Sequence, residues 1–551
     1  MKQTFTQMHA ADNVLVALQD LKKGTKIEQY GVNFTLQSDI EAKHKFTTTP
    51  LSIGDEVIMY GVLVGKATQP IAQGAWISTA NLRHESEGYS LTKRQPFSWQ
   101  APNVSQWVNR TFMGYHRNDG SVGTRNYWLV IPLVFCENRN ILLLKDAFER
   151  ELGFAQPDKY RWQVHQLLDL YEKGKMAEID LIQFEDIKMV PSVRNRHFPN
   201  VDGIKFLTHE MGCGGTNQDC QTLAEVFAGF CLNANVAGIT VLSLGCQKTQ
   251  IEDVKAEIYK RNPHFDKPII YFNQQTYGTE HALMSAAVRN TFKGLIAINK
   301  IERQPAPISK INLGLKCGGS DGFSGISANP ALGHVSDILV SLGGTTFLAE
   351  FPELCGVEQD LINRCKKVED AEKFMVLMDT YAAQAEAVGA GFDMNPSKGN
   401  IRDGLITDAI KSAGAAKKGG NAPISGVLNY TEQPATSGLH LLCTPGNDVL
   451  ATTGMAASGA NLIVFTTGLG TPTGNAVTPT VKVSTNSRLA AKMPDIIDFN
   501  SGEIISGEET IPQNGDALLE YLIGLASGEY LTKAEILGQD DFIPWRRGIN
   551  L

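Results

Sequence analysis

Apolar runs that end abruptly in polar, glycine-rich loops recur along this chain. In the clearest case Ile311, Leu313 and Leu315 lead into LGLKCGGSDGFSG (313–325), where cysteine, serine and aspartate stand among the glycines. Short apolar runs with such endings predict buried strands. The same layout occurs in residues 203–215, 237–250 and 461–474. Because open α/β sheets bind ligands at the carboxyl ends of their strands, we predict that these four strand ends converge on one crevice.

The pattern also divides the chain into parts. Residues 1–84 alternate short β-rich runs with glycine turns, which predicts a small β-dominated module. Residues 85–108 are polar and aperiodic, as is typical of a linker. Strand, loop and helix signals alternate over 109–301, which indicates a parallel sheet with right-handed crossovers. The proline-containing stretch 302–310 opens a last domain, 302–551, so the predicted fold class is multidomain α/β.

Two further segments complete this picture. Residues 145–200 are charged, helix-like and carry scattered aromatic side chains, and we interpret them as an insertion or interface element. In the run that follows Cys213, apolar residues recur on one helical face that includes Phe227 and Cys231, which predicts that Cys231 lies in the core.

Composition excludes several functional classes. The chain has 551 residues, of which 42% are apolar and 20% charged, and its net charge is −8. No broad basic surface follows from that balance, so nucleic acid and anionic membranes are not expected partners. The first residues lack the pattern of a signal peptide and no run approaches the roughly 20 apolar residues of a membrane span, so the expected location is cytoplasmic. The oligomeric state stays open, with a homo-oligomer as one option.

The polar loops suggest a metal and an oxygen-rich anion. The chain lacks the motifs of P-loop enzymes, serine hydrolases, zinc peptidases and dinucleotide-binding enzymes. Its nine cysteines contain no CxxC pair, so neither a disulfide framework nor a zinc ribbon is indicated. Thiolate and imidazole ligands favour Fe(II) or Zn, whereas carboxylate and hydroxyl ligands favour Mg, Mn or Ca. The candidate metal ligands are His209, Cys213, Cys246 and Cys317. The alternative is that these cysteines are merely small residues beside tight turns.

Other candidate site residues follow from their positions. Glu350 ends an apolar strand, where a carboxylate is either functional or held by a salt bridge or cap. Arg125 and Asn126 stand just before the apolar run 128–135 and therefore belong at its N-terminal end. The N-terminal module contributes His9, His44, Lys45 and Arg83, for each of which a surface or structural role is the plain alternative.

Several motifs together resemble one enzyme family. HAADNVLVAL, GYHRNDGSVGTRN, LSLGC, GLKCGGSDGFSGISANPALG, NPSKGN and FTTGLGTPTG occur in the order found in the altronate dehydratase and galactarate dehydratase family. The similarity covers nearly the whole chain. It implies an N-terminal SAF-type β module followed by a larger catalytic region that ends in a domain of unusual fold.

The resemblance implies removal of water from a sugar acid, giving a 2-keto-3-deoxy acid, with a divalent metal, most often Fe(II) and otherwise Mn(II) or Mg(II). The hydrogen at C2 is only weakly acidic, so the enediolate formed on its loss needs concentrated positive charge. A base takes this proton and an acid assists departure of the C3 hydroxyl. On this reading the acid–base candidates are His9, His44, Lys45 and Glu350. The residues expected to hold the substrate are Gly318, Gly319, Ser320, Asp321 and Ser324, with Arg83, Arg125 and Asn126 as further candidates.

Two departures from the family pattern favour altronate as the substrate. Gln247 stands where many relatives have glutamate, and Leu469 stands where some carry arginine. If the glutamate and arginine of the relatives recognise the second carboxylate of the substrate, their absence here disfavours galactarate and favours an aldonate. The competing hypotheses are an iron–sulfur dehydratase with cysteines 213, 246 and 317 as ligands, a lyase acting on a sulfonated hydroxy acid, and a sugar-acid binding protein without catalysis.

Overall fold

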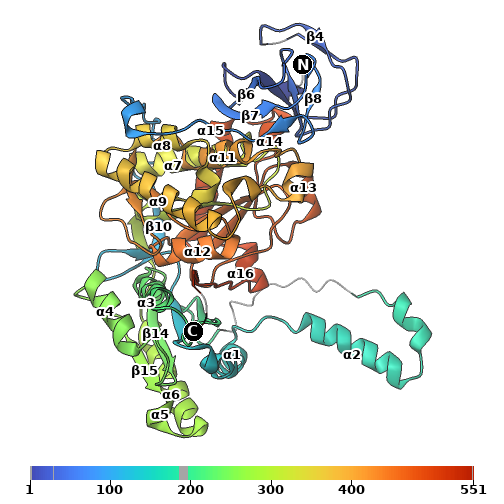
Figure 1. Cartoon of the computed structure of the whole chain (residues 1–551). Helices are drawn as coiled ribbons and strands as arrows, with labels where there is room; N and C mark the ends of the chain where they lie inside the picture. Colours follow the sequence, from blue (N-terminus) through green and yellow to red (C-terminus); the bar gives the residue numbers. More distant parts are fainter. Residues whose placement is uncertain (1–2, 29, 185–195, 549, 551) are drawn as a thin grey trace.

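The computed structural model describes residues 3–28, 30–184, 196–548 and 550. Figure 1 shows a small N-terminal module at one end, a large C-terminal domain in the centre and a middle domain at the other end. From the middle domain an arm that contains α2 projects away from the rest of the chain. Among the described residues, no helix is both long and apolar enough to cross a bilayer.

The N-terminal module consists of short antiparallel strands. They form a four-stranded sheet in the order β1-β2-β5-β8, a three-stranded sheet β6-β7-β9 and the pair β3-β4. The predicted β-rich module is therefore observed. Its strands are β1 (Phe5–Thr6), β2 (Val14–Ala17), β3 (Lys26–Ile27), β4 (Phe34–Thr35), β5 (Lys45–Thr47), β6 (Glu56–Met59), β7 (Val62–Ala67), β8 (Trp76–Ile77) and β9 (Leu82–Arg83).

The middle domain is built on a parallel sheet in the order β13-β12-β14-β15. Helices α1 and α6 share one apolar core on one side of this sheet, and α3 and α4 share another. The α3 face is buried as predicted, and Cys231 is fully buried. The elements are β12 (Tyr127–Pro132), α1 (Asn138–Leu152), β13 (Gly203–Phe206), α3 (Asn217–Leu232), β14 (Val236–Ser243), α4 (Ile251–Arg261), β15 (Ile269–Asn273), α5 (Gln274–Tyr277) and α6 (Glu280–Ile298).

A small antiparallel sheet joins the middle and C-terminal domains. Its order is β11-β10-β16, formed by β10 (Thr111–His116), β11 (Val122–Gly123) and β16 (Gln304–Pro307). The stretch 302–310, expected to be a break, thus contains an edge strand whose prolines lie where a missing N–H is tolerated.

The C-terminal domain contains a seven-stranded, wholly parallel sheet in the order β19-β20-β18-β17-β21-β22-β23. After β17 the chain first adds strands on one side and then returns to the other side at β21, so the order reverses at β17. Such a reversal opens a crevice at the carboxyl ends of the strands. The strands are β17 (Asn312–Cys317), β18 (Thr345–Ala349), β19 (Ile424–Leu428), β20 (Gly438–Leu442), β21 (Leu462–Thr467), β22 (Thr480–Ser484) and β23 (Phe499–Asn500).

Helices cover both faces of this sheet. The main core includes residues of α7 and α15 with one face of β17, and a smaller core places α12 on the other face. The helices are α7 (Ala328–Ser341), α8 (Glu358–Arg364), α9 (Val368–Glu386), α10 (Lys398–Arg402), α11 (Asp408–Ala416), α12 (Asp448–Ala457), α13 (Ser487–Lys492), α14 (Glu503–Ser506), α15 (Ile511–Ala526) and α16 (Lys533–Leu537).

The four glycine-rich strand ends do not share one crevice. The two that follow β13 and β14 belong to the middle sheet, whereas those that follow β17 and β21 belong to the C-terminal sheet. The local pattern identified each strand correctly, but it carried no information on which sheet each strand joins. The end of β17 carries the larger group of buried charges, including Lys316, Glu350 and Glu353.

Candidate active site

Ionisable side chains gather at the carboxyl ends of β17 and β18. Most of them are nearly or fully buried, and only the Asp448 side chain is a third exposed, at 33%. Burying so many charged groups is costly unless they neutralise one another or serve a ligand. The cluster consists of Lys316, Cys317, Glu350, Glu353, Lys411, Lys418 and Asp448.

Local structure directs these side chains to one place. Lys316 and Cys317 are neighbours in β17, so their side chains leave opposite faces of the sheet, and Lys316 reaches Asp448 at the start of α12. Glu350 has a φ of +69°, in the left-handed region that non-glycine residues rarely adopt. Its backbone N–H donates to Thr444 Oγ1 at 3.0 Å, which supports this conformation. Strain of this kind concentrates at functional sites.

The ion pairs are short and interlocked. Lys316 Nζ lies 2.8 Å from Glu350 Oε1 and 2.7 Å from Asp448 Oδ1. Lys411 Nζ lies 3.0 Å from Glu353 Oε1. Lys418 Nζ donates to Cys317 Sγ at 2.8 Å, and Cys317 Sγ lies 3.3 Å from Glu353 Oε2. Three ammonium groups therefore face three carboxylates and one thiol.

The two glutamates have opposite shifts in acidity. Burial, together with the charge of Glu353, raises the pKa of Glu350 above its ordinary value. Burial acts in the same sense on Glu353, but Lys411 and Lys418 outweigh it and hold the pKa of Glu353 well below its ordinary value. Two adjacent carboxyl groups whose pKa values are driven apart are typical of an acid–base site.

Several buried polar atoms beside the cluster have no hydrogen-bond partner among the described residues. They are Ser320 Oγ, Glu350 Oε2, Asn395 Nδ2 and Ser412 Oγ. Lys411 links Asn395 to the cluster, because its Nζ contacts both Glu353 and Asn395 Oδ1, the latter at 2.9 Å. Buried polar groups are almost always satisfied in native proteins. These atoms therefore mark a polar space that suits a hydroxylated, anionic ligand.

Cys317, Glu350 and Glu353 fit a divalent metal ion. In the described part of the chain they form the one group of three or more candidate ligands whose donor atoms all lie within 4.8 Å of one another. Glu350 Oε2 has no hydrogen-bond partner among the described residues, although Lys418 Nζ lies 3.9 Å away. Burial raises the pKa of the Cys317 thiol to about 11, so a bound cation would have to favour the thiolate and compete with Lys418 for it. A thiolate with carboxylates suits Fe(II) or Zn better than Mg.

The N-terminal module closes against the same crevice through Lys43. This residue has a φ of +77°, and its Nζ lies 3.1 Å from Asp321 Oδ2 and 2.8 Å from Asp403 Oδ1. A Cβ on Gly322 or on Gly404 would lie 2.5 Å from the Lys43 carbonyl oxygen, so both loops need glycine to admit this backbone.

Lys45, next to it in β5, is almost completely buried. Its Nζ donates to the carbonyl oxygens of Gly404 at 2.5 Å and Lys43 at 3.0 Å. Burial lowers the pKa of Lys45 to about 7. At this pKa a substantial fraction of the Lys45 side chain is a neutral amine at neutral pH, and its lone pair can then accept a proton beside the loop that follows β17.

The other candidates of the N-terminal module are placed less favourably. His44 is buried, contacts the Arg402 carbonyl through Nε2 at 3.1 Å and accepts from Trp76 through Nδ1 at 3.3 Å, so both ring nitrogens are used. Burial lowers the pKa of His44. His9 is exposed and accepts the Ala11 N–H. Arg83 is 71% exposed and faces Glu85. None of the three joins the buried cluster.

Three of the four predicted metal ligands lie in the middle domain, away from Cys317. Both ring nitrogens of His209 are engaged, Nε2 with the Pro132 carbonyl at 2.8 Å and Nδ1 with the Met211 N–H at 3.0 Å. Burial lowers the pKa of His209 to about 4. Cys213 and Cys246 are exposed in the loops after β13 and β14. The structure thus separates these three residues from Cys317, because they follow strands of a different sheet.

Arg125 and Asn126 are structural at the N-terminal end of β12, as their position in the sequence suggested. The Arg125 guanidinium is buried and forms two hydrogen bonds with Glu535, at 2.7 and 3.0 Å. Asn126 Nδ2 donates to the carbonyls of Asn200 and Ile298. Because the Arg125 guanidinium makes four hydrogen bonds within the protein and Asn126 uses both of its amide hydrogens, neither side chain is directed toward a substrate carboxylate.

The loop after β17 is tightly packed within the protein. The N–H groups of Gly318 and Gly322 donate to the carbonyls of Thr466 and Asp403, at 3.1 and 2.7 Å. A Cβ on Gly318 would lie 2.4 Å from Asp448 Oδ1. At both positions glycine serves close packing, and their N–H groups are not available to an anion. Gly319, also in this loop, lies beside the loop after β21, because its carbonyl accepts the Gly468 N–H at 3.0 Å.

Asp321 and Ser324 hold the shape of this loop together. Asp321 Oδ1 accepts from the Phe323 N–H at 3.2 Å and from Ser324 Oγ at 3.1 Å. Asp321 Oδ2 accepts from Thr485 Oγ1 at 3.1 Å and pairs with Lys43. Of the polar side chains predicted to hold the substrate from this loop, Ser320 keeps a free hydroxyl, whereas those of Asp321 and Ser324 are committed to protein partners.

The lysines of the cluster were not predicted from the sequence. Lys316 carried a signal, since parallel strands covered on both faces are almost wholly apolar and a lysine inside one is exceptional. Lys411 and Lys418 carried none, because α11 and the turn that follows it reach the cluster only through tertiary packing. Glu353 stands three residues after Glu350, but only the short helical turn 351–354 brings it back to Cys317.

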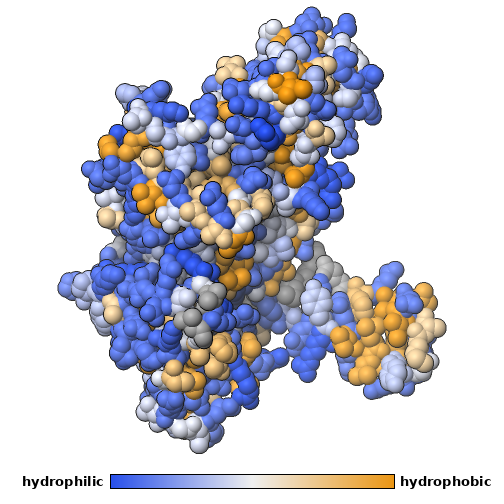
Figure 2. Space-filling view, viewed as in Figure 1, coloured by the Kyte–Doolittle hydropathy of each residue, from blue (hydrophilic) through white to orange (hydrophobic). Residues whose placement is uncertain are grey.

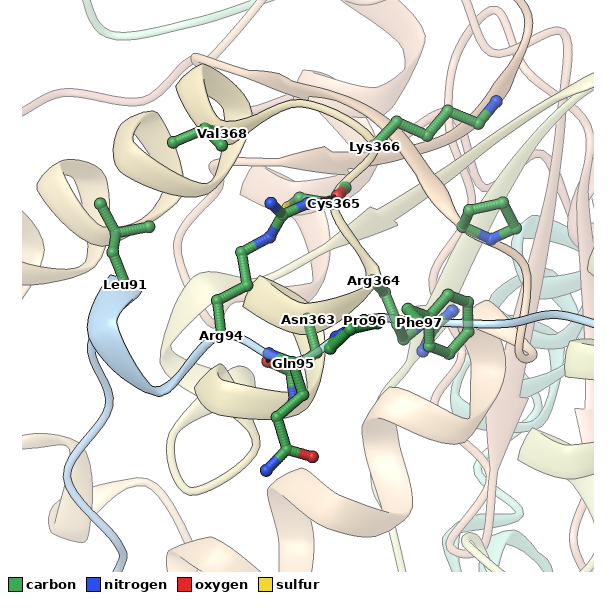
Figure 3. Close-up of a pocket in the computed structure, with 11 residues that line it drawn as sticks. Leu91, Arg94, Gln95, Pro96, Phe97, Asn363, Arg364, Cys365, Lys366 and Val368 are labelled. Atoms are coloured by element: carbon green, nitrogen blue, oxygen red, sulfur yellow. Dashed lines mark hydrogen bonds between the residues drawn. The ribbon is translucent and has the colours of Figure 1, made fainter.

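A cavity of about 530 Å³ elsewhere on the surface carries no comparable chemistry. Figure 3 shows that linker residues 94–97 line it together with residues 363–366. Its arginines are occupied, since Arg94 donates to the Cys365 carbonyl at 2.5 Å and Arg364 to that of Ala422 at 2.9 Å. The cavity lies where the linker packs against the C-terminal domain.

Comparison with known proteins links the three parts of the chain to one family. Residues 308–550 match the family model described as D-galactarate/altronate dehydratase, C-terminal. Residues 114–299 match D-galactarate dehydratase/altronate hydrolase, second domain, and residues 3–85 match the altronate/galactarate dehydratase SAF domain.

Individual relatives match over most of their length. Altronate dehydratases of Bacillus subtilis and Escherichia coli are 32% and 31% identical, each aligned over at least 95% of both chains. Galactarate dehydratase (L-threo-forming) of Escherichia coli is 28% identical over 97% of this chain and 95% of its own. The beta subunit of a (2R)-sulfolactate sulfo-lyase of Chromohalobacter salexigens is 28% identical over 79% of this chain and 97% of its own.

Proposed function

The chain belongs to the altronate and galactarate dehydratase family, and on that premise we propose that it removes water from D-altronate to give 2-keto-3-deoxy-D-gluconate with the help of a divalent metal. Its relatives support a sugar-acid dehydratase and hence a hydro-lyase. The observation that carries the proposed site is the buried cluster of three lysines, two glutamates and a cysteine at the ends of β17 and β18, beside polar atoms that lack a partner.

Glu350 is the proposed base for the C2 proton. Its Oε2 has no hydrogen-bond partner in the described part of the chain, and burial raises the pKa of Glu350 toward the range in which a carboxylate accepts a proton usefully. Lys316 holds the other oxygen at 2.8 Å and so fixes the orientation of the carboxylate. Glu353, whose pKa is lowered, stays ionised beside Cys317.

The remaining groups stabilise charge and hold hydroxyls. Lys411 and Lys418 lie 3.0 and 3.7 Å from the Glu353 carboxylate, and preorganised cations at the site would offset the negative charge that develops on the substrate during proton loss and so lower the barrier. Ser320 Oγ, Asn395 Nδ2 and Ser412 Oγ are available for sugar hydroxyls. Lys45, buried and with a pKa of about 7, is the second acid–base candidate, at the seam with the N-terminal module.

Cys317 and Glu353 would hold the metal ion, with Glu350 as its neighbour. Such an ion, when bound, supplies a Lewis acid that polarises the substrate carboxylate. Fe(II) is the proposed metal, because a thiolate donor favours it over Mg(II), with Mn(II) as the alternative.

The preference for altronate rests on Leu469. This side chain is 40% exposed in the loop after β21, and its Cβ lies 3.3 Å from the position a Cβ on Gly319 would occupy. An apolar residue there offers no partner for a second carboxylate, which favours an aldonate over galactarate. Gln247 does not enter this argument, because it is buried in the middle domain, where its Oε1 accepts the Gly245 N–H at 2.7 Å.

An anaerobic substrate panel tests the function. Altronate, other aldonates, galactarate and sulfolactate are each incubated with the chain and Fe(II), Mn(II), Mg(II) or a chelator. We expect a 2-keto-3-deoxy acid from altronate only when metal is present. A higher kcat/KM with galactarate than with altronate would make galactarate the substrate. Release of sulfite from sulfolactate would show that the enzyme is a sulfo-lyase and not a dehydratase.

The role of Cys317 predicts a change in metal content. Cys317→Ser replaces a soft donor by a weak hydroxyl, so iron bound per chain after anaerobic loading should fall at least about tenfold. Elemental analysis of the desalted protein measures it. The matched control is Cys443→Ser, another buried cysteine, which follows β20 of the same sheet. Equal iron content in the two variants would show that Cys317 is not a metal ligand.

A further inference from the structure

Asp408 is a buried carboxyl group that has no role in the site described so far. Figure 2 shows that hydrophilic residues make up most of the visible surface of the body, where water solvates their charges. Asp408 lies beneath the surface of the protein and is only 1% exposed. Neither of its carboxyl oxygens has a hydrogen-bond partner among the residues that the structure describes. An ionised carboxylate in such a position is very costly, so this environment favours the neutral acid, which carries a proton.

Helix α11 directs Asp408 toward the candidate active site. Asp408 is the first residue of α11, and Lys411 and Ser412 follow it at i+3 and i+4, so the three side chains lie on one face of the helix. Lys411 pairs with Glu353 at 3.0 Å, which places this face against the ion-pair cluster. Ser412 is fully buried, and its Oγ also lacks a partner in the described part of the chain. The face of α11 that meets the cluster therefore carries two polar groups that are available to a ligand.

Two further segments meet this face of α11. The helical turn 351–354, which carries Glu353, packs against the helix. The loop that contains Asn395 reaches the same place, because Lys411 Nζ donates to Asn395 Oδ1 at 2.9 Å. The other amide atom of this residue, Asn395 Nδ2, is buried without a partner in the described ranges. Asp408 therefore lies on the wall of a polar space to which three separate segments contribute.

The charges around Asp408 act on its acidity in both directions. Burial raises the pKa of Asp408 well above its ordinary value, and the nearby carboxylates of Glu353 and Glu358 act in the same sense. The Cys355 thiol and the Lys411 ammonium lower the pKa but do not offset the effect of burial. The first turn of a helix also favours an anion. Among the described residues, however, no N–H of that turn donates to either oxygen of Asp408.

Dehydration of a sugar acid requires a proton donor of this kind. Hydroxide is a poor leaving group, so cleavage of the C3–O bond at neutral pH needs a proton on the departing oxygen. Lys45 is less suited to this step, because its Nζ already donates to the carbonyl oxygens of Gly404 and Lys43. The neutral carboxyl of Asp408 has an O–H with no acceptor in the part of the chain that the structure describes. Its proton is therefore available to a substrate hydroxyl.

We propose that Asp408 is the general acid that protonates the C3 hydroxyl of the substrate as it leaves, an assignment that rests on the proposed dehydratase function. The C2–H bond breaks and its proton passes to Glu350. The electron pair of that bond forms the double bond between C2 and C3, while the C3–O bond breaks and the departing oxygen takes the Asp408 proton to leave as water. The enol then loses the proton of its C2 hydroxyl and gains one at C3, which gives the 2-keto-3-deoxy acid. Transfer of one proton from Glu350 to Asp408 through water restores both groups.

A substrate analogue with a different leaving group tests the acid. 3-Deoxy-3-fluoro-D-altronate loses fluoride, which departs without protonation, and gives the same 2-keto-3-deoxy acid. Asp408→Asn should lower kcat with altronate by about 10²–10⁴-fold but should lower kcat with the fluoro analogue by less than about tenfold. Glu350→Gln removes the base and should slow both substrates. The matched control is Glu358→Gln, which replaces another buried carboxyl beside Cys355 and should slow neither.

Infrared spectroscopy gives a measurement that does not depend on turnover. At pH 7 the difference spectrum of wild type minus Asp408→Asn should contain the C=O stretch of a protonated carboxylic acid. Its absence would mean that Asp408 is ionised and would overturn the proposal. Asp408→Glu, which keeps a carboxylic acid at this position, should retain more activity with altronate than Asp408→Asn, and less activity would also overturn it.

The two substrates separate failure of this inference from failure of the proposed function. Equal losses of kcat with altronate and the fluoro analogue in Asp408→Asn would indicate a structural or binding role and would overturn the assignment of the acid alone. An unchanged kcat with altronate would overturn it as well. A wild-type chain that forms no 2-keto-3-deoxy acid from any sugar acid would overturn the proposed function and this inference together.

Discussion

Glu350→Gln is expected to lower kcat by about 10²–10⁴-fold, the range by which a general base contributes to proton transfer. The amide keeps the size of the side chain but cannot accept the proton from C2. The fold should persist, because Lys316 retains Asp448 as a partner at 2.7 Å. Initial rates of 2-keto-3-deoxy acid formation, with bound iron and the thermal melting curve measured on the same samples, check the prediction.

A matched control separates catalysis from structure. Glu358 is also buried, burial raises its pKa to about 7, and its Oε2 accepts the Gly356 N–H at 2.7 Å outside the cluster. Glu358→Gln should therefore leave kcat within a few-fold of wild type. If Glu350→Gln lost iron together with activity, Glu350 would be a metal ligand and not the base. If it melted far below wild type with normal iron, its role would be structural.

The fold could be predicted in its parts but not in its assembly. Strands such as β12, β14, β17 and β21 were identified because apolar runs between glycine turns are a local signal. Their distribution over two sheets could not be predicted, because strands of both sheets have the same local sequence pattern. The interface of the two α/β domains depends on buried amides, among them Asn235, whose Nδ2 donates to the Asn461 and Val477 carbonyls at 2.9 Å. No periodicity reveals such a pairing.

The candidate site divides in the same way. Cys317 and Glu350 were found because each ends a strand, and the structure brings them together with Glu353. The lysines that set their charge come from α11, from the turn that follows it and from β17, and nothing in the neighbouring sequence distinguishes Lys411 from a surface lysine. Lys45 was selected as a conspicuous residue of the N-terminal module, but its burial depends on contacts with Gly404, which follows 359 residues later.

Lys316→Met is expected to destabilise the protein by about 3–5 kcal/mol, because it leaves Glu350 buried without its short ion pair. Lys418 remains, but its Nζ is 3.9 Å from Glu350 Oε2. The double variant Lys316→Met/Glu350→Gln should recover much of the loss, since it removes the stranded carboxylate as well. Urea unfolding at fixed pH measures the free energy of unfolding for the single and double variants.

The loss should also depend on pH with a defined sign. Burial raises the pKa of Glu350 in the folded wild type, and removal of Lys316 raises it further, whereas in the unfolded chain it returns to about 4.3. The folded variant therefore binds the proton more tightly than the unfolded chain does. Its stability relative to wild type should be nearly constant below about pH 7, where Glu350 is protonated in both folded proteins, and should fall as the pH rises above 7.

Lys482→Met provides the contrasting substitution. Lys482 lies in β22, is fully buried and contacts the same Phe465 ring as Lys316, at 4.5 Å compared with 5.0 Å from the ring centroid. It has no hydrogen-bond partner in the described part of the chain, and burial lowers its pKa to about 8. Its replacement leaves no carboxylate stranded, so stability should change little or increase. Equal losses for the two lysine variants would show that packing against Phe465, and not the ion pair with Glu350, is what Lys316 contributes.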